Sequence, residues 1–582
     1  MIERAPSSAP HPAPAPRGGF FSSTGRARFG WVHPPAEPRT GSALVIVPPF
    51  GYEAICARRT LRALADAAAR DGVIAIRADL DGTGDSEGDD LDPGRVDAWL
   101  QSIDDACALA RGQGADRIVL AGVRLGATLA TLAAARRDDV AGVVAIAAVP
   151  SGKALVREGR ALQLHLGLER TDPATELVGF ALAPETRDAL AQIDLLRATR
   201  PPAPAMLVLD RDDLAPNDRW VEALRALGVN VAHVRLTGYI EMMLDPHRAQ
   251  VARAFVDITA AFAAAVQPLA TSPRSVPDVV LAPRAEIAVG DARLTEELVA
   301  LDDRMIAIAS RARAAPRRAV ILLNAGAVYR VGPNRLHVAI ARRFARQGDL
   351  VLRVDLSGIG DSAPRDGAFD DDVYSSHAIA DVGVAVAWAR SAGAREVAVV
   401  GLCSGAYHAL KAAVAGQPID IVVAINPLTF FWKPGMPLDF AAFRVTADAQ
   451  RYQQKALDVG AWKRVLRGEV DVKRAARVVA ERARSLATSR AKDLARRLRV
   501  PLADDLGSEL LAIARRGVAT RFVFAGGDPG LAMLREQGGS AIAQLERAGK
   551  LAIEVIEGPD HTFTPRWSQP LLVEAIARAV AR

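Results

Sequence analysis

Short apolar runs alternate with longer amphipathic stretches along most of the chain. The apolar runs at 43–47 and 73–78 are bounded by Gly, Pro or Asp, whereas the stretch 58–71 between them repeats its apolar residues every three or four positions. Short runs of this kind predict β-strands, and the helical period predicts an α-helix. Strands that alternate with helices are typical of βαβ units, in which helices cover both faces of a parallel sheet.

The same order of predicted elements occurs twice along the chain. The segment RADLDGTGDS at 77–86 corresponds to RVDLSGIGDS at 353–362, an offset of 276 residues. The other matching pairs are 45–51 with 320–326, 58–71 with 334–347, 73–78 with 350–354, and 117–135 with 396–414. An internal repeat of this length indicates two copies of one fold. Each half is therefore predicted to be a doubly wound α/β domain with a mostly parallel sheet.

Changes in composition set the expected domain boundaries. Residues 1–20 are rich in Ala and Pro and predict a disordered tail, and the Pro- and Ser-containing segment 267–283 predicts a linker. We therefore expect a first domain at 21–266 and a second domain at 284–582.

Each expected domain contains a helical insertion between its fourth sheet strand and the next strand, at about 151–203 and 427–516. A lid over the carboxyl ends of the strands would lie there. Within the second insertion, 472–499 has apolar residues at helical spacing and predicts a basic amphipathic helix. Such a helix is either a solvated outer face or a docking surface for an anionic carrier, lipid or membrane surface.

The net charge of +6 is concentrated in that insertion. Between Lys463 and Arg499 there are 13 Lys and Arg against 4 Asp and Glu, so the rest of the chain is slightly acidic. No aromatic side chains are interleaved with these charges, as single-stranded nucleic acid binding would require. We therefore expect no nucleic-acid partner.

The composition predicts a folded, soluble chain. Half of the residues are hydrophobic and 24% are charged, which disfavours disorder. The three cysteines form no C-x-x-C pair, so neither a disulfide framework nor a zinc site is predicted. The N-terminus lacks the apolar core of a secretory signal, and no uncharged apolar stretch approaches 18 residues. We expect a cytoplasmic protein with no cofactor and no metal.

The sequence GLCSG at 401–405 follows a predicted strand and opens a predicted helix. This is the setting of a nucleophile elbow, in which flanking glycines relieve crowding in a strained turn. Centring the elbow on Ser404 would require glycines where Leu402 and Ala406 stand, so the spacing selects Cys403. A helix N-terminus lowers the pKa of a thiol, which favours Cys403 as nucleophile. A small buried hydrophobic residue is the alternative interpretation of Cys403.

Candidates for an acid and a base follow the next two strands. Asp528 comes after the apolar run 521–525, and His561 comes after the run 551–556. In an α/β-hydrolase the acid and the base follow the nucleophile in this order, each beyond a strand end. The chain therefore resembles the α/β-hydrolase superfamily, in tandem copies that cover about 45–265 and 285–580.

A narrower resemblance is to the exosortase-associated hydrolases of exopolysaccharide gene clusters. The first half, with FGWVHPP, PPFGYE and GVRLGA, is similar to their second type. The second half, with NAG, RVGPNR, DLSGIGDS and GLCSGA, is similar to their first type. The resemblance says little about the substrate, because a fold does not fix a function.

Further residues are candidates for binding. The backbone N–H groups of Ser404 and Ala325 are the expected oxyanion-hole donors. Asn324 and Arg330 are candidate substrate contacts, since Arg330 could hold an anionic group, although solvated arginines are commoner. His408 lies on the helix after the elbow and is expected to pack rather than to catalyse.

The first half lacks the corresponding chemistry. Arg124 occupies the centre of its elbow, and Asp213 and Glu241 stand where the alignment of the two copies places Asp528 and His561. Arginine is permanently cationic and cannot act as a nucleophile. The first domain is therefore predicted to be degenerate.

These residues predict an acyl hydrolase or acyltransferase that acts on a small acylated substrate, an ester or a thioester. Cys403, Asp528 and His561 would form its triad. The alternative is a non-catalytic accessory protein of polysaccharide assembly, with two pseudo-hydrolase pockets that bind an acylated or glycosylated ligand. The two hypotheses differ in whether the fold brings Cys403 and His561 into hydrogen-bond reach.

Overall fold

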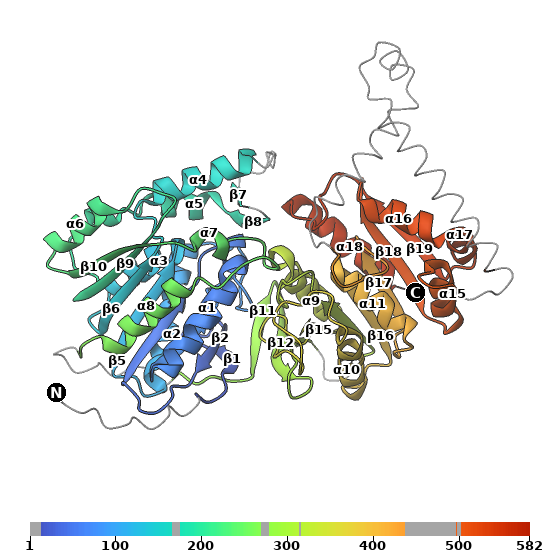
Figure 1. Ribbon diagram of the computed structural model, residues 1–582, viewed down its shortest axis with the longest axis horizontal. Coiled ribbons are helices and arrows are strands. Elements are labelled where there is room, and N and C mark those ends of the chain that lie inside the picture. Colours follow the sequence, from blue (N-terminus) through green and yellow to red (C-terminus); the bar gives the residue numbers. More distant parts are fainter. Residues whose placement is uncertain are drawn as a thin grey trace, which may run out of the picture. The chain divides into compact units, whose positions relative to one another are not determined.

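A computed structural model describes residues 13–165, 175–177, 179–268, 279–312, 316–436, 496 and 502–581. The chain divides into two compact units. The first comprises Met1–Val299, Ile308–Ala312 and Asn334–Arg346, and the second comprises Ala300–Ala307, Arg313–Pro333 and Gln347–Arg582. The fold is α/β, and its two large sheets are mixed (Figure 1).

The first large sheet has eight strands in the order β1-β2-β4-β3-β5-β6-β9-β10. Its strands are β1 (Arg17–Phe21), β2 (Arg28–His33), β3 (Ser42–Val47), β4 (Ile74–Ala78), β5 (Arg117–Val123), β6 (Val140–Ile146), β9 (Ala205–Arg211) and β10 (Asn230–Leu236). Strands β1 and β2 are antiparallel to their neighbours, and the pairs from β4 to β10 are parallel.

Helices cover both faces of this sheet. They are α1 (Tyr52–Arg70), α2 (Arg95–Gly112), α3 (Leu125–Ala135), α6 (Asp218–Ala226), α7 (Tyr239–Met242) and α8 (Arg253–Ala265). In β3, Leu44 packs in one apolar cluster with α1 and α8, and Val45 packs in another with α2 and α3. Successive side chains of a strand point to opposite faces, so β3 is apolar throughout because both of its faces are buried.

The second large sheet has nine strands in the order β11-β12-β13-β15-β14-β16-β17-β18-β19. They are β11 (Arg284–Val289), β12 (Ala292–Ala300), β13 (Ile306–Arg311), β14 (Arg318–Leu323), β15 (Leu350–Asp355), β16 (Glu396–Leu402), β17 (Ile421–Ile425), β18 (Ala519–Ala525) and β19 (Leu551–Ile556). The pairs from β15 to β19 are parallel, so the carboxyl ends of these strands meet at one edge. The associated helices are α9 (Leu336–Arg346), α10 (Ala378–Ser391), α11 (Ser404–Val414), α15 (Leu506–Arg515), α16 (Pro529–Gly538), α17 (Ser540–Arg547) and α18 (Gln569–Val580).

Two of the expected boundaries differ from the structure. Strand β1 begins at Arg17, so the disordered tail expected at 1–20 is wrong for its last four residues. The first unit also continues beyond the linker expected at 267–283. The physical reason is an apolar cluster within this unit, in which Phe20 and Phe29 pack with Ile287 and Leu294. Burying these side chains favours keeping the hairpin β11–β12 with β1 and β2.

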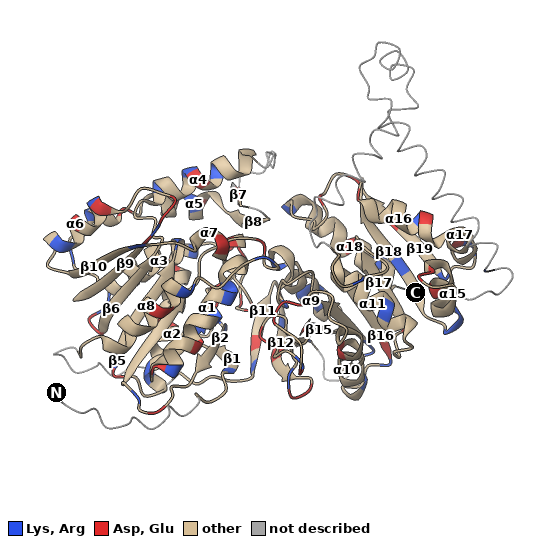
Figure 2. Cartoon of the chain, viewed as in Figure 1, with Lys and Arg blue, Asp and Glu red and all other residues tan. Residues whose placement is uncertain are grey.

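The two expected insertions fall between β6 and β9 and between β17 and β18. The first contains α4 (Gly152–His165), the hairpin β7 (Thr175–Leu177) and β8 (Phe180–Leu182), and α5 (Pro184–Ala191). Most of the second, including all of the expected basic helix 472–499 except Arg496, lies outside the described residues. Its anionic partner therefore stays a prediction. Over the elements drawn in colour in Figure 2, basic and acidic residues are interspersed. None of the helices in the described ranges is long and apolar enough to span a bilayer.

Candidate active site

Cys403 lies in the sharp turn between β16 and α11. Its φ of 59° and ψ of −116° are strained for a residue with a side chain. A Cβ on Gly401 would come within 2.1 Å of the Gly405 carbonyl group, and a Cβ on Gly405 within 2.7 Å of the Asn324 carbonyl oxygen. Neither glycine can be replaced without moving backbone. This close packing holds the turn, and it centres the elbow on Cys403 rather than on Ser404.

The three cysteines differ in their surroundings. Cys403 is partly exposed, whereas Cys56 and Cys107 are buried. Burial raises the pKa of the Cys56 thiol and of the Cys107 thiol to about 12, because a thiolate loses its hydration there. Both are therefore protonated and unreactive at neutral pH, and Cys403 is the cysteine that solvent can reach.

Asp528 and His561 meet at the carboxyl ends of β18 and β19. The His561 Nδ1 atom lies 2.7 Å from the Asp528 Oδ2 atom, and both side chains are almost fully buried. The other carboxylate oxygen of Asp528 accepts a hydrogen bond from the Gly530 N–H at 2.9 Å, which caps the N-terminus of α16. With both oxygens engaged, the carboxylate has a fixed orientation toward the imidazole.

The Cys403 thiol is the second partner of His561. Burial alone would lower the pKa of His561, but the charge and hydrogen bond of Cys403, together with Asp528, raise it to about 9. The Cys403 thiol therefore lies within interaction range of His561. An imidazole with this pKa holds a proton at neutral pH.

Asn426, a residue that sequence reasoning missed, supports the His561 loop. It follows β17 and is fully buried, with a φ of 44°. Its side-chain Nδ2 donates to the His561 carbonyl at 2.6 Å, and its Oδ1 accepts from the Ala525 N–H at 2.8 Å. One amide thus joins the end of β18 to the loop of the histidine. The first unit has Ala147 at the equivalent strained position, with φ 46° and no amide.

The expected oxyanion donors lie on both sides of the elbow. Ser404 is the first residue of α11, so its N–H has no acceptor within the helix. Ala325 is buried in the loop after β14. The next residue of that loop, Gly326, donates its N–H to the Ser404 hydroxyl at 2.9 Å, which fixes the loop against the helix. The oxyanion role of Ser404 and Ala325 stays a prediction.

The structure contradicts the substrate contact expected for Arg330. This side chain is buried, and its Nη1 atom lies 2.8 Å from an oxygen of Asp355 and 2.9 Å from one of Asp361. Asn324 is buried beside it, donating to Asp355 and to the Val328 carbonyl. Both residues hold the glycine-containing turn after β15 against the loop after β14. The carboxylate partners of Arg330 and Asn324 lie 25 to 31 residues away in sequence, so the sequence pattern around Arg330 does not reveal them.

The first unit keeps the shape of the elbow without its chemistry. Arg124 has a φ of 55° and a ψ of −119°, close to the values at Cys403. Its guanidinium is buried, with Nε 3.1 Å from a Glu53 oxygen and Nη2 2.5 Å from a Glu158 oxygen. Glu53 lies in the first turn of α1, Glu158 lies on α4 and Arg124 caps α3, so Arg124 connects three helices.

The residues of the first unit that align with Asp528 and His561 are Asp213 and Glu241. Asp213 pairs with Arg211. Glu241 is exposed on α7, whereas Tyr239 on the same helix is buried. The Arg211 guanidinium stacks 3.9 Å from the centre of the Tyr239 ring. Gly238 caps α7, so the residue after it turns inward and the residue three places on turns outward.

The described part of the chain offers no evident metal site, since none of its His, Cys, Asp or Glu side chains gather in groups of three or more that could hold an ion.

Comparison with known proteins finds a family whose model matches part of the chain. Residues 320–576 match the model of the alpha/beta hydrolase family. The match begins in β14 and ends in α18, so it contains the elbow, Asp528 and His561. A comparison with curated proteins finds no match.

Solved structures similar to part of the chain include esterases. Est1E from Butyrivibrio proteoclasticus, with ferulic acid bound, has 19% identity and a TM-score of 0.32, over 38% of this chain and 89% of its own. An esterase from Pyrobaculum calidifontis has 15% identity and a TM-score of 0.30, over 44% of this chain and 85% of its own. Brefeldin A esterase, a bacterial homologue of human hormone-sensitive lipase, has 20% identity and a TM-score of 0.30, over 45% and 80%.

The amide of Asn426 generates a first prediction. Asn426→Ala should loosen the His561 loop and lower the rate of Cys403 alkylation by iodoacetamide at pH 7 by about tenfold, because a displaced imidazolium no longer stabilises the thiolate. Alkylation is followed by intact mass. Asn426→Asp, which keeps an acceptor for the Ala525 N–H but loses the donor to His561, should resemble Asn426→Ala. Unchanged alkylation in both variants would contradict a positioning role for Asn426.

A second prediction concerns Arg124. Arg124→Ala leaves the carboxylates of Glu53 and Glu158 without their guanidinium and should lower the free energy of unfolding of the first unit by about 1–3 kcal/mol. Denaturant titration of the full chain measures this as a shift of one transition. Arg136→Ala is the matched control, since Arg136 is exposed at the end of the same helix. An equal shift in both variants would show that the Arg124 pairs contribute nothing of their own.

Proposed function

We propose that the protein is an acyl hydrolase, or an acyltransferase, that uses Cys403 as its nucleophile, His561 as its acid and base, and Asp528 to orient His561. The observation that carries this proposal is the 2.7 Å contact between His561 and Asp528, near the thiol of Cys403 on its strained turn. A buried carboxylate, an imidazole that holds a proton, and a partly exposed thiol on a strained turn are the components that nucleophilic acyl transfer requires.

The chemistry follows from these positions. The Cys403 thiolate attacks the acyl carbon, and the carbonyl oxygen gains a negative charge between the N–H groups of Ser404 and Ala325. The tetrahedral intermediate collapses as the His561 imidazolium gives its proton to the leaving group, which departs as an alcohol or thiol. A thioester on Cys403 remains. Neutral His561 then takes a proton from water, or from the hydroxyl of another acceptor, and the oxygen of that molecule attacks the thioester. The C–S bond breaks, which releases the acid or the new ester and restores the Cys403 thiolate.

Asp528 matters for the tautomer of His561. Its contact with Nδ1 requires a proton on Nδ1, which leaves Nε2 as the nitrogen that exchanges protons with the thiol and the substrate. A carboxylate in this position also stabilises the imidazolium.

The alternative function, a non-catalytic accessory protein of polysaccharide assembly, suits the first unit better than the second. Arg124 fills the elbow of the first unit and is paired with two carboxylates, so no nucleophile stands at that elbow. The contact between Cys403 and His561 favours the enzyme for the second unit. We therefore propose catalysis in the second unit and a non-catalytic role for the first.

The nucleophile assignment predicts that Cys403→Ala lowers hydrolysis of phenyl esters or thioesters by about 10³-fold or more, because the triad acts as a unit. Intact mass should show an acyl adduct on the wild type and none on the variant. Cys56→Ala and Cys107→Ala are controls that remove buried thiols elsewhere, and both should keep the adduct. Equal turnover by wild type and Cys403→Ala would exclude Cys403 as the nucleophile.

The raised pKa of His561 predicts the pH dependence. Leaving-group protonation needs the imidazolium, which is lost as pH rises through about 9, so kcat/KM for ester hydrolysis should fall above that pH. Alkylation of Cys403 by iodoacetamide needs only the thiolate and should not fall there. The two profiles, measured on one preparation, separate the proton donor from the nucleophile.

The raised pKa also has a consequence for stability. A histidine whose pKa is raised on folding contributes stability that is fully present below its unfolded pKa of about 6.5 and is lost as pH rises through the folded value.

If ester hydrolysis and alkylation instead rise together past pH 9, His561 is not the acid that protonates the leaving group.

A further inference from the structure

The backbone beside the elbow offers two N–H groups that have no acceptor. Within the described part of the chain, neither the Ala325 N–H nor the Ser404 N–H donates a hydrogen bond. Ala325 lies in the loop after β14 and Ser404 begins α11, so the two donors belong to separate elements. An oxyanion gains full stabilisation only if each donor lies about 3 Å from it. The spacing between the loop and the helix therefore decides how well two such donors act together.

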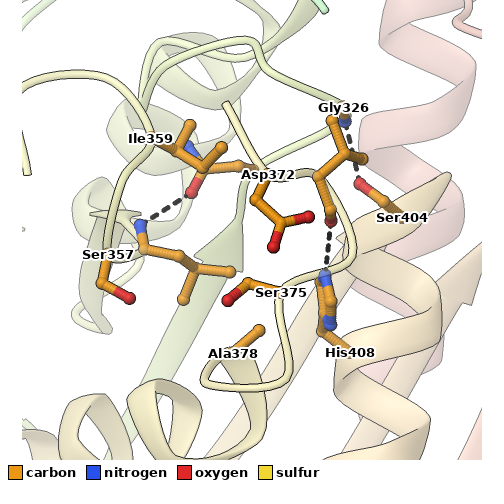
Figure 3. A pocket seen from close by; sticks show the side chains of 11 residues that line it. Gly326, Ser357, Ile359, Asp372, Ser375, Ala378, Ser404 and His408 are labelled. Atoms are coloured by element: carbon orange, nitrogen blue, oxygen red, sulfur yellow. Dashed lines mark hydrogen bonds between the residues drawn. The ribbon is translucent and has the colours of Figure 1, made fainter. Parts of the chain in front are cut away.

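The hydroxyl of Ser404 joins these two elements. Its oxygen accepts a hydrogen bond from the Gly326 N–H at 2.9 Å, which Figure 3 shows between the two labelled residues. Ser404 is only 1% exposed, so water has little access to this hydroxyl. Gly326 directly follows Ala325 in the chain, so a shift of Gly326 also shifts the Ala325 donor.

Other hydrogen bonds of this loop fix it to a different part of the second unit. The Asn324 Nδ2 atom donates to the Asp355 carboxylate at 3.2 Å, and the Arg330 N–H donates to it at 2.6 Å. Asp355 ends β15, and β15 and β16 lie on opposite sides of β14 in the sheet. These bonds hold the two ends of the loop, and the Ser404 hydroxyl holds its middle to the elbow helix.

The first unit has a similar turn without this hydroxyl. Gly51 aligns with Gly326 and also has a positive φ. Leu125, however, stands where the second unit has Ser404. A leucine side chain has no acceptor for an N–H group. The hydroxyl is therefore missing in the unit whose elbow also lacks a nucleophile, which favours a role in the chemistry over a role in forming the turn.

We propose that Ser404 is a positioning residue, whose hydroxyl holds the Ala325 N–H at the distance from the Ser404 N–H that an oxyanion requires. This inference rests on the proposed acyl-transfer function. The carbonyl oxygen of a substrate gains its charge only on the way to the tetrahedral intermediate, so correct spacing stabilises that state more than the bound substrate. Loss of the hydroxyl slows turnover without weakening substrate binding.

The variant Ser404→Ala tests the proposal in the full-length protein. With phenyl acetate as substrate, kcat should fall by about tenfold or more and KM should stay within about twofold, because the lost interaction forms only in the transition state. The rate of Cys403 alkylation by iodoacetamide should not change, since alkylation forms no oxyanion. A wild-type kcat, or an equal fall in turnover and alkylation, would overturn the proposal.

A matched control is Ser375→Ala. Ser375 is also buried and lines the same small cavity as Ser404, but its hydroxyl oxygen accepts from the His377 N–H, outside the loop after β14. This variant should keep the wild-type kcat. Equal losses in Ser375→Ala and Ser404→Ala would show that turnover responds to any buried hydroxyl near the elbow, and the specific role of Ser404 would be refuted.

A sulfur analogue of the substrate reports on the two donors. Phenyl thionoacetate carries C=S in place of the C=O of phenyl acetate, and sulfur is a weaker hydrogen-bond acceptor than oxygen. The ratio of kcat/KM for the oxygen ester to that for the sulfur ester should fall by about tenfold in Ser404→Ala and stay unchanged in Ser375→Ala. An unchanged ratio in Ser404→Ala would contradict a role in oxyanion stabilisation.

Aldehyde binding separates this proposal from the catalytic one. The Cys403 thiolate adds to the carbonyl carbon of phenylacetaldehyde, the π electrons of the C=O bond move to the oxygen, and the oxygen takes a proton from the His561 imidazolium. Carbon NMR with a carbonyl-labelled aldehyde measures the dissociation constant of this hemithioacetal, which should rise by about fivefold in Ser404→Ala.

The two failures then look different. A weaker hemithioacetal in Ser404→Ala, with no ester hydrolysis by the wild type, would refute only the proposed function. Ester hydrolysis by the wild type, with equal aldehyde affinity in the wild type and Ser404→Ala, would refute only the positioning role.

Discussion

The candidate site depends on one steric constraint, the lack of room for a Cβ at Gly401 and Gly405. These two positions press backbone against backbone, which forces the residue between them into a positive φ and lifts its side chain above the sheet. The parallel pairing from β15 to β19 brings the loops after these strands together, because the carboxyl ends of the strands share one edge. Asp528 and His561, each just beyond a strand, therefore reach the same place as Cys403.

Much of this arrangement could be predicted from local sequence. The strands β17 and β19 have the expected bounds. Each of them is apolar on at least one face, and turn residues end both. The centre of the elbow could be predicted at Cys403 because the two glycines that define it lie within five residues of sequence. The placement of Asp528 and His561 could be predicted because each is a polar residue in the loop that follows a strand.

The residues that escaped prediction have partners far away in sequence. Asn426 bonds to His561, 135 residues later, and Arg330 pairs with Asp355 in the next strand's turn. A buried ion pair and a substrate-binding arginine look alike until the opposing carboxylate is located. Tyr239 was missed for a different reason, since the orientation of residues in the short helix α7 depends on its Gly238 cap. Arg124 and Cys403, at the centres of the two elbows, share one backbone conformation. This conformation therefore indicates the fold and not the activity.

The two carboxylate oxygens of Asp528 contact different groups, so this side chain links two parts of the second unit mechanically. One oxygen caps α16 and the other meets the imidazole of His561. Rotation of the carboxyl group about its Cβ–Cγ bond would break both contacts at once, so a single torsion angle couples the first turn of a helix to the aim of a ring. Thermal motion of α16 would be transmitted to His561 through this one bond. The orientation of the His561 ring thus depends in part on how well a neighbouring helix is packed.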